Sequence, residues 1–333
     1  IEAALRKFAT EAGITITAYN AAGEAVASAV TDANGQYALK ISAQYAGQSL
    51  LLKASDTSAD GQGYIDEATG ESKDFSVSLR AMVQLGTETT QKAQISTATE
   101  LATRVMGIDS DSNSLSDTTA AKINAANKAV AKFLGLGDNA DIVKTEAPDV
   151  VGKGDTSNTT SDAYGKGLAL LSGMDAVAER GGSNNATNDA LDKLASAFTL
   201  SVSGTVETDF NDPELLDLLS QAVTEVAQTQ GSGLAQDLAG IALNAVTSQA
   251  SATTLAFFMT SSRNLIGDGK TATLQFHFDT VPTAEQLTQL AKDLSVTGGS
   301  LGELNVDSSD ATGLTYQATF TQAGIDAPQI SVS

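Results

Sequence analysis

The chain has 333 residues, which is enough for two or three domains with buried cores. Its 19 Lys and Arg residues against 40 Asp and Glu residues give a formal net charge of −21, which argues against binding to nucleic acid or anionic membrane surfaces. It has no Cys, no Trp and a single His, which excludes thiol catalysis, disulfides and Cys/His metal sites.

The sequence offers no candidate for a targeting segment or a membrane span. Residues 1–8 hold too few consecutive apolar residues for the hydrophobic region of a signal peptide. No run approaches the roughly 18 apolar residues that a spanning helix needs. We therefore expect either a cytoplasmic protein or a mature exported protein, and the absence of Cys fits export.

The first part of the chain, about residues 13–85, is expected to form a small β-sandwich. Alternating apolar residues, or short apolar runs, predict strands at 13–18, 36–42, 49–54 and 75–79. Asn34 and Gly35 predict a turn before the second of these strands. Ahead of the strands, the spacing of Ile1, Leu5 and Phe8 favours a helix over residues 1–11.

The middle of the chain has a helical pattern from about residue 87. We expect a helix at 95–106 that stops at Gly107, and another that starts near Ser116 or Asp117 and stops at Gly135. Further helices are expected at 164–177, 188–198 and 234–246. The clearest helix start has Asp212 as cap, Pro213 at the first helical position and Glu214 in the first turn. Residues 200–206 are read either as part of a hairpin between helices or as a strand.

From about residue 253 the pattern returns to β. Strands are expected at 255–260, 271–278, 293–297, 302–306, 314–320 and 329–332, with a short helix capped by Thr283 between two of them. The order β, α, β predicts three domains, at residues 1–86, 87–251 and 252–333.

Several segments resemble modules of bacterial surface proteins. Residues 14–23 (ITITAYNAAG) and 31–39 (TDANGQYAL) resemble the carboxypeptidase-regulatory-like module, which is a transthyretin-like sandwich. The segments YIDEATG (64–70) and LRA (79–81), with Ala-rich helices that end in FLGLG (133–137), resemble the helical half that often follows. Residues 269–276 (GKTATLQF), 294–302 (LSVTGGSLG) and 315–320 (TYQATF) resemble a bacterial Ig-like domain of large adhesins.

Together, pattern and resemblance predict a multidomain α+β protein with an N-terminal β-sandwich, a central α-helical bundle and a C-terminal Ig-like β-sandwich. The regulatory-like module usually opens with a strand in the place that residues 1–11 hold. If that strand is missing, the sandwich has an open edge that a strand from another molecule can fill.

One acidic stretch has the alternating oxygen ligands of an EF-hand calcium loop: Asp109, Asp111, Asn113 and Asp117. The turn glycine is replaced by Ser114, and Ala120 stands where the bidentate acid belongs. A polar connector that caps the next helix is therefore the preferred interpretation, with Ca²⁺ as the alternative and no other cofactor expected. A second acidic loop at 56–67 and the scattered Asp307, Asp310 and Asp326 are read as solvated loops, again with Ca²⁺ as the alternative.

The remaining candidates for chemistry favour structural roles. His277 is expected to face solvent from its strand, and nothing in the sequence specifies a nucleophile beside it. The glycine pairs at 152–154, 165–167 and 231–233 lack the context of a phosphate-binding loop and are read as turns and helix ends.

These features predict a non-enzymatic structural or adhesive protein, extracellular and at the bacterial cell surface. The expected partner is a second copy of the chain, joined head to tail into a filament by strand exchange, or another surface module. The alternative is a glycan- or peptide-binding module of a large adhesin, for which aromatic residues are few. A hydrolase that uses carboxylates is the weaker rival.

Overall fold

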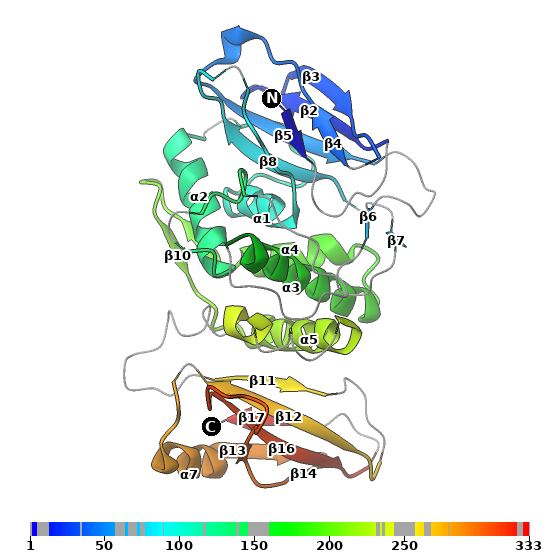
Figure 1. Ribbon diagram of the computed structural model, residues 1–333, viewed down its shortest axis with the longest axis vertical. Coiled ribbons are helices and arrows are strands. Elements are labelled where there is room, and N and C mark those ends of the chain that lie inside the picture. The colour runs from blue at the N-terminus through cyan, green and yellow to red at the C-terminus, as the bar shows by residue number, and fades with distance from the viewer. Residues whose placement is uncertain are drawn as a thin grey trace.

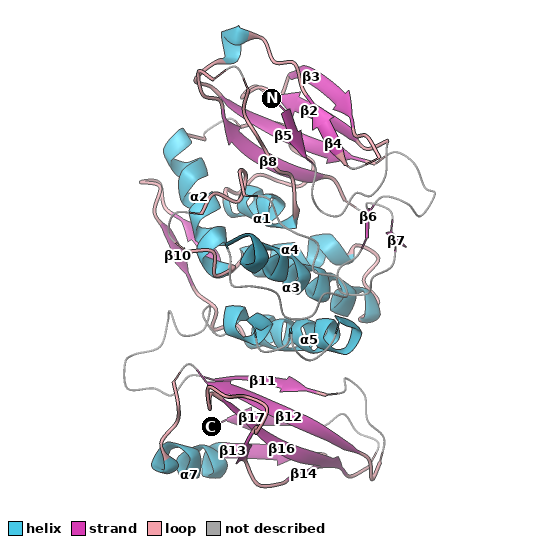
Figure 2. Ribbon diagram, viewed as in Figure 1, coloured by secondary structure: helices cyan, strands magenta, loops and turns pink. Residues whose placement is uncertain are grey.

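The computed structural model describes residues 2–4, 13–33, 35–56, 64–65, 72–73, 77–88, 90–115, 118–137, 140–145, 160–230, 234, 237–242, 257–262, 268–278, 280–324 and 329–332. Over these residues the chain has a mixed α+β fold with antiparallel sheets. Strands, then helices, then strands again follow one another as three layers of a stack (Figure 1). Figure 2 shows that helices make up almost all of the middle layer.

The first layer is built on a four-stranded antiparallel sheet in the order β3-β2-β5-β8. Its strands are β2 (Thr15–Tyr19), β3 (Ala25–Val30), β5 (Ser49–Ser55) and β8 (Leu79–Gln84). Two small sheets accompany it: β1 (Glu2–Ala4) with β4 (Gln36–Ala38), and β6 (Tyr64–Ile65) with β7 (Ser72–Lys73). A single 3₁₀ turn, η1 (Ala43–Tyr45), precedes β5.

The first layer corrects several predictions. The helix expected over residues 1–11 is wrong at residues 2–4, which form β1 and pair with β4. An isolated helical segment of that length is marginal in water, whereas a neighbouring strand satisfies its backbone groups directly. The strand expected at 36–42 ends at Ala38, and the one expected at 75–79 begins only at Leu79. Strand β3 was not predicted.

The middle layer contains α1 (Thr97–Val105), α2 (Ala120–Phe133), α3 (Thr160–Arg180), α4 (Ala186–Ala195) and α5 (Pro213–Gln230). The predicted stops at Gly107 and Gly135 are confirmed, because both glycines take positive φ, 74° and 73°. The predicted start of α5 is also confirmed, since the Asp212 carboxylate accepts from the amide of Glu214. The predicted cap of α2 is wrong: Thr119 caps it and accepts from the Lys122 amide.

Two glycines of α3 allow the helices to approach closely. A Cβ at Gly167 would lie 2.9 Å from Cδ2 of Leu134, and one at Gly173 would lie 2.6 Å from the carbonyl oxygen of Ala222 on α5. Reading Gly165 and Gly167 as a turn or helix end is therefore wrong, because both lie inside α3. The other two glycine pairs lie outside the described residues.

A hairpin joins α4 to α5. It consists of β9 (Phe198–Leu200) and β10 (Val206–Thr208), which pair across a turn at residues 201–205. The prediction of a hairpin between helices is thus confirmed, whereas a continuous strand over residues 200–206 is wrong because residues 201–205 form the turn. At the base of the hairpin, Phe198 packs against Phe210 and Phe133 with ring centroids 5.5 and 6.1 Å away.

The third layer is a sheet in the order β11-β12-β16-β14, in which β15 also pairs with β16. Its strands are β11 (Phe257–Ser261), β12 (Thr271–Phe278), β14 (Gly299–Leu301), β15 (Asn305–Val306) and β16 (Thr315–Gln322). Strand β13 (Leu294–Thr297) pairs separately with β17 (Gln329–Val332). Helix α7 (Ala284–Asp293) begins with a capping box between Thr283 and Gln286, which confirms the predicted cap.

The hydrophobic core does not follow the three layers. Buried residues of the first sheet and of the helices form one continuous cluster, which runs from Ile14 to Phe258 of β11. A second cluster joins β12, β16 and α7. The predicted domain boundary between residues 86 and 87 remains a prediction. Core residues on both sides of it, such as Leu85 and Ala93, belong to the first cluster.

Candidate functional site

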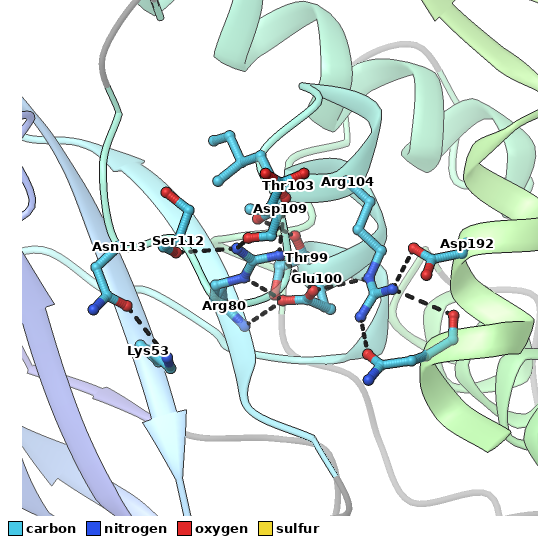
Figure 3. Close-up of polar contacts among 12 residues, drawn as sticks. Lys53, Arg80, Thr99, Glu100, Thr103, Arg104, Asp109, Ser112, Asn113 and Asp192 are labelled. Carbon is cyan, nitrogen blue, oxygen red and sulfur yellow. Dashed lines mark hydrogen bonds and ion pairs between the residues drawn. The ribbon is translucent and has the colours of Figure 1, made fainter. Parts of the chain in front are cut away.

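A buried ionic cluster lies between the first sheet and the helices (Figure 3). At its centre is Arg80 of β8, which is fully buried. Its Nε and one terminal nitrogen donate to the Glu100 carboxylate of α1, at 2.9 and 2.8 Å. The terminal nitrogens also donate to the backbone carbonyls of Ile108 (3.2 Å), Asp109 (2.5 Å) and Ser112 (3.2 Å). Every N–H of the guanidinium therefore has an acceptor.

Glu100 is saturated as an acceptor. Its Oε2 accepts from both the backbone amide and the Nε of Arg80, each at 2.9 Å. Its Oε1 accepts from the other side of the Arg80 guanidinium and from Nε of Arg104, one helical turn along α1. Two hydrogen bonds at each oxygen fill the lone pairs of an ionised carboxylate. Glu100 thus has no lone pair left with which to act as a base.

Arg104 extends the cluster to the next helix. One terminal nitrogen lies 2.5 Å from the Asp192 carboxylate of α4 and 3.3 Å from the Asn188 carbonyl, and the other donates to the side chain of Asn188. Two arginines thus meet two carboxylates, so the formal charges within the cluster cancel. The side chains of Arg80, Glu100 and Arg104 are buried, whereas that of Asp192 is 67 % exposed. Buried charges are tolerated when they are paired and hydrogen-bonded in this way. The cluster joins β8, α1, the loop after α1 and α4.

Three of the candidate calcium ligands, Asp109, Asp111 and Asn113, lie in the loop that wraps Arg80. The Asp109 carbonyl accepts from Arg80, and the Asn113 side chain accepts from Nζ of Lys53 at 3.2 Å. The cation that this loop holds is therefore a guanidinium, with an ammonium beside it. Asp117 lies outside the described residues, and the structure does not test the set as a whole. Over the described residues, no group of three or more acidic or His side chains is arranged to hold a metal ion.

A second polar contact joins α5 to the edge of the third layer. Ser220, Thr224 and Gln228 are spaced four residues apart, so they lie along one face of the helix. They bond the backbone of β11 and the residue after it: Ser220 donates to Met259 O, Thr224 accepts from Ser261 N at 3.2 Å, and Gln228 donates to Ser262 O at 3.1 Å. Side chains of a helix thus take the place of a neighbouring strand.

His277 does not face solvent, so that prediction is wrong. Its side chain is buried between two threonines of the adjacent strands, with Nε2 3.1 Å from Oγ1 of Thr260 and Nδ1 3.3 Å from Oγ1 of Thr315. Burial lowers its pKa to about 4, although Asp310 and Asp307 act in the opposite direction. The imidazole is therefore neutral at pH 7, and its two nitrogens bond threonines rather than an activated nucleophile.

Two buried tyrosines serve as hydrogen-bond donors between segments. The Tyr164 hydroxyl donates to the Ile142 carbonyl at 3.0 Å and lies 2.8 Å from the Ser96 hydroxyl, which caps α1. The Tyr37 hydroxyl donates to the Ala93 carbonyl at 3.2 Å. Burial raises the pKa of both phenols well above the usual range, so both remain protonated.

Sequence reasoning missed the arginine cluster, although the sequence carries two signals for it. Arg80 is the only charged residue in the apolar run of residues 79–83, and a charge in such a run needs a buried partner. Glu100 and Arg104 stand four residues apart, in a segment that also has apolar residues at helical spacing. The two side chains therefore lie on the same face of the expected helix.

Comparison of the chain with protein-family models, with curated proteins and with solved structures found no match. None of the helices in the described part of the chain has the length and apolarity to cross a membrane.

Proposed function

We propose that this chain is a non-enzymatic structural or adhesive module of an extracellular protein at the bacterial cell surface. The observation that carries the proposal is the way in which the three layers are joined. The Arg80 cluster ties the first sheet to the helices, and the polar face of α5 ties the helices to β11. Three layers with polar contacts across both interfaces suit a protein that transmits mechanical load or keeps its neighbours at a fixed distance.

The buried polar groups support the same role. The Glu100 carboxylate is filled by arginine donors, and the His277 ring bonds Thr260 and Thr315. Groups of these types serve as acids and bases when they face a substrate. Here their hydrogen bonds connect strands and helices.

The proposal includes a finer description of the layers. The first sheet with β1 and β4 would be the carboxypeptidase-regulatory-like sandwich, the helices a central bundle, and the third layer the Ig-like sandwich. In support, β2 alternates between buried and half-buried residues, and Ala272, Leu274, Phe276 and Phe278 of β12 are all buried. The segments that carry the resemblance include β2 and residues 271–276 of β12.

Assembly through strand exchange is part of the proposal and needs one additional step. Strands β1 and β17 pair within the chain, with β4 and β13. A head-to-tail filament would therefore form by release of an end strand and its pairing with the same site in a neighbouring copy.

Surface labelling and adhesion test the proposed function. Antibodies raised against the purified chain should label intact source cells, and cells that lack the chain should adhere less to surfaces or to one another. An Arg80→Ala variant, which loosens the joint between sheet and helices, should restore adhesion less well than the original chain, whereas Arg180→Ala should restore it fully. Labelling that requires cell lysis would contradict the proposal.

A further inference from the structure

Unpaired edges of the two main sheets are where other strands could add, and three of the four edges are sealed. At β8, α1 packs along the strand and the Glu100 carboxylate accepts the backbone amide of Arg80 at 2.9 Å. At β11, three polar side chains of α5 bond the carbonyl of Met259, the amide of Ser261 and the carbonyl of Ser262. The other edge of the third-layer sheet lies beside β16. Two short strands, β14 and β15, share this position, with residues 302–304 between them, so it presents no continuous edge.

Among the residues that the structure describes, none of these devices covers the fourth edge, β3. No strand in the described part of the chain pairs with its outer side. Its sequence, Ala-Val-Ala-Ser-Ala-Val, contains no charge and no proline, which are the usual guards of an edge. The bulge opposite β2 affects only its first residues, near Ala25, and the pairing is regular from Ala27 to Val30.

The backbone of β3 presents hydrogen-bonding groups to solvent at two positions. Thr31 directs both backbone groups toward β2, because its amide donates to Ile14 O and its carbonyl accepts from Gly13 N. Backbone directions alternate along a strand, so Ser28 and Val30 point their N–H and C=O groups away from β2. Both side chains are exposed, Val30 to 59 %.

Acidic residues flank this edge. Glu24 precedes β3 and Asp32 follows it, and both are exposed. Two copies of β3 paired antiparallel about Ser28 would place Glu24 of each copy opposite Asp32 of the other, since 24 and 32 are equally far from 28. Like charges directly opposite destabilise strand pairing, and each chain carries a net charge of −21. The edge therefore disfavours a second copy and favours a strand with positive ends.

We propose that the outer edge of β3 binds an extended segment of a partner protein that has small or β-branched residues in its middle and Lys or Arg at both ends. The segment adds a fifth strand to the first sheet. Its backbone bonds Ser28 and Val30, and its basic ends lie near Glu24 and Asp32. This interaction surface goes beyond the proposed structural role and does not depend on it.

The test uses a short synthetic peptide of alternating Thr and Val with Lys at each end, and a control peptide with Glu at each end. Titration is followed by calorimetry and by hydrogen exchange of the intact chain. The Lys peptide should bind, should slow exchange at the Ser28 and Val30 amides, and should bind less tightly as NaCl is raised. The Glu peptide should bind at least about tenfold more weakly.

A proline variant of the protein separates strand addition from other modes of binding. Ser28→Pro removes an N–H that faces solvent, which an edge strand tolerates, and should weaken peptide binding by about tenfold or more. Val202→Pro is the matched control: Val202 is 93 % exposed and is followed by the turn glycine Gly204, so proline fits there and binding should not change. If Ser28→Pro fails to fold, Glu24→Gln with Asp32→Asn should remove the preference for the Lys peptide.

Four results would overturn the proposal. The first three are an absence of binding at millimolar Lys peptide, equal binding of the Lys and Glu peptides, and exchange protection at residues other than Ser28 and Val30. The fourth is concentration-dependent dimerisation without peptide, with protection of the same amides, which would assign the edge to a second copy.

Discussion

Removal of the Arg80 side chain should be far more costly than removal of an arginine that forms a surface ion pair. The matched pair of variants is Arg80→Ala and Arg180→Ala. Arg180 of α3 binds Glu225 of α5, and 40 % of its side chain is exposed. Both variants delete the same atoms, so the difference between them reports the environment alone.

The expected magnitude follows from what Arg80→Ala leaves behind. The carbonyls of Ile108, Asp109 and Ser112 lose their donor, and Glu100 keeps only the Arg104 guanidinium and one backbone amide. Removing one partner of a buried ion pair costs about 3–5 kcal/mol, because the remaining charge is poorly compensated. An exposed pair contributes about 0–1 kcal/mol, which is the loss expected for Arg180→Ala.

Urea denaturation followed by circular dichroism measures the free energy of unfolding of each variant. For a cooperative unit of this size, the loss expected for Arg80→Ala corresponds to a melting temperature lower by roughly 10 °C. Arg80→Lys keeps the charge but not the planar fork of donors, so its stability should lie between those of the original chain and Arg80→Ala.

Equal losses for Arg80→Ala and Arg180→Ala would refute the reasoning. A double-mutant cycle adds a second check. Arg80→Met combined with Glu100→Met removes both charged partners, so its loss should be smaller than the sum of the two single losses. An additive result would mean that the two side chains do not act as a pair.

Three further predictions concern the packing, the buried histidine and the acidic loop. Gly173→Ala should destabilise the chain by about 1–3 kcal/mol, because its Cβ would meet the Ala222 carbonyl at 2.6 Å; Gly240→Ala, whose Cβ meets nothing within 4 Å, should stabilise it by about 0.5–1 kcal/mol in the same denaturation assay. Burial lowers the pKa of His277 to about 4, so as the pH falls this side chain is protonated in the unfolded chain before it is protonated in the folded one. Roughly 3 kcal/mol of the free energy of unfolding present above pH 6.5 is therefore lost as the pH falls to about 4. His277→Gln should lose less stability than the original chain over that interval; an identical pH dependence would contradict the assignment. Millimolar Ca²⁺ and EDTA should give the same melting temperature, since the loop at 109–113 binds Arg80 and Lys53. A melting temperature that is higher in Ca²⁺ than in EDTA, with a difference that Asp111→Asn abolishes, would show that the loop binds calcium.

The elements that sequence reasoning placed correctly are those with local signals. Strand β12 is found at residues 271–278 as predicted, because apolar residues alternate along its whole length. The starts of α5 and α7 are also as predicted, because Asp212 and Thr283 bond amides within their own first turns. In each case the decisive interaction lies within a few residues.

The predictions that failed depend on distant parts of the chain. His277 alternates with apolar residues and so looked exposed, but it is buried and its ring bonds Thr260 and Thr315 of the adjacent strands. Gly167 looked like part of a turn because its sequence does not show that Leu134 packs against the helix there. The strand β1 forms only because β4 offers it a partner. Tertiary contacts decide such positions, and no local pattern reports them.

Arg80 leaves the ribosome before any of the groups that bind its guanidinium. The carboxylate of Glu100 follows 20 residues later and the carbonyl of Ser112 follows 32 residues later. At a synthesis rate of about 5–20 residues per second, the last strand of the first sheet waits on the order of seconds with an unpaired cation. The charge keeps this apolar segment hydrated and discourages its aggregation during that interval. The Arg80 guanidinium can therefore be fully paired only after α1 and its following loop have emerged.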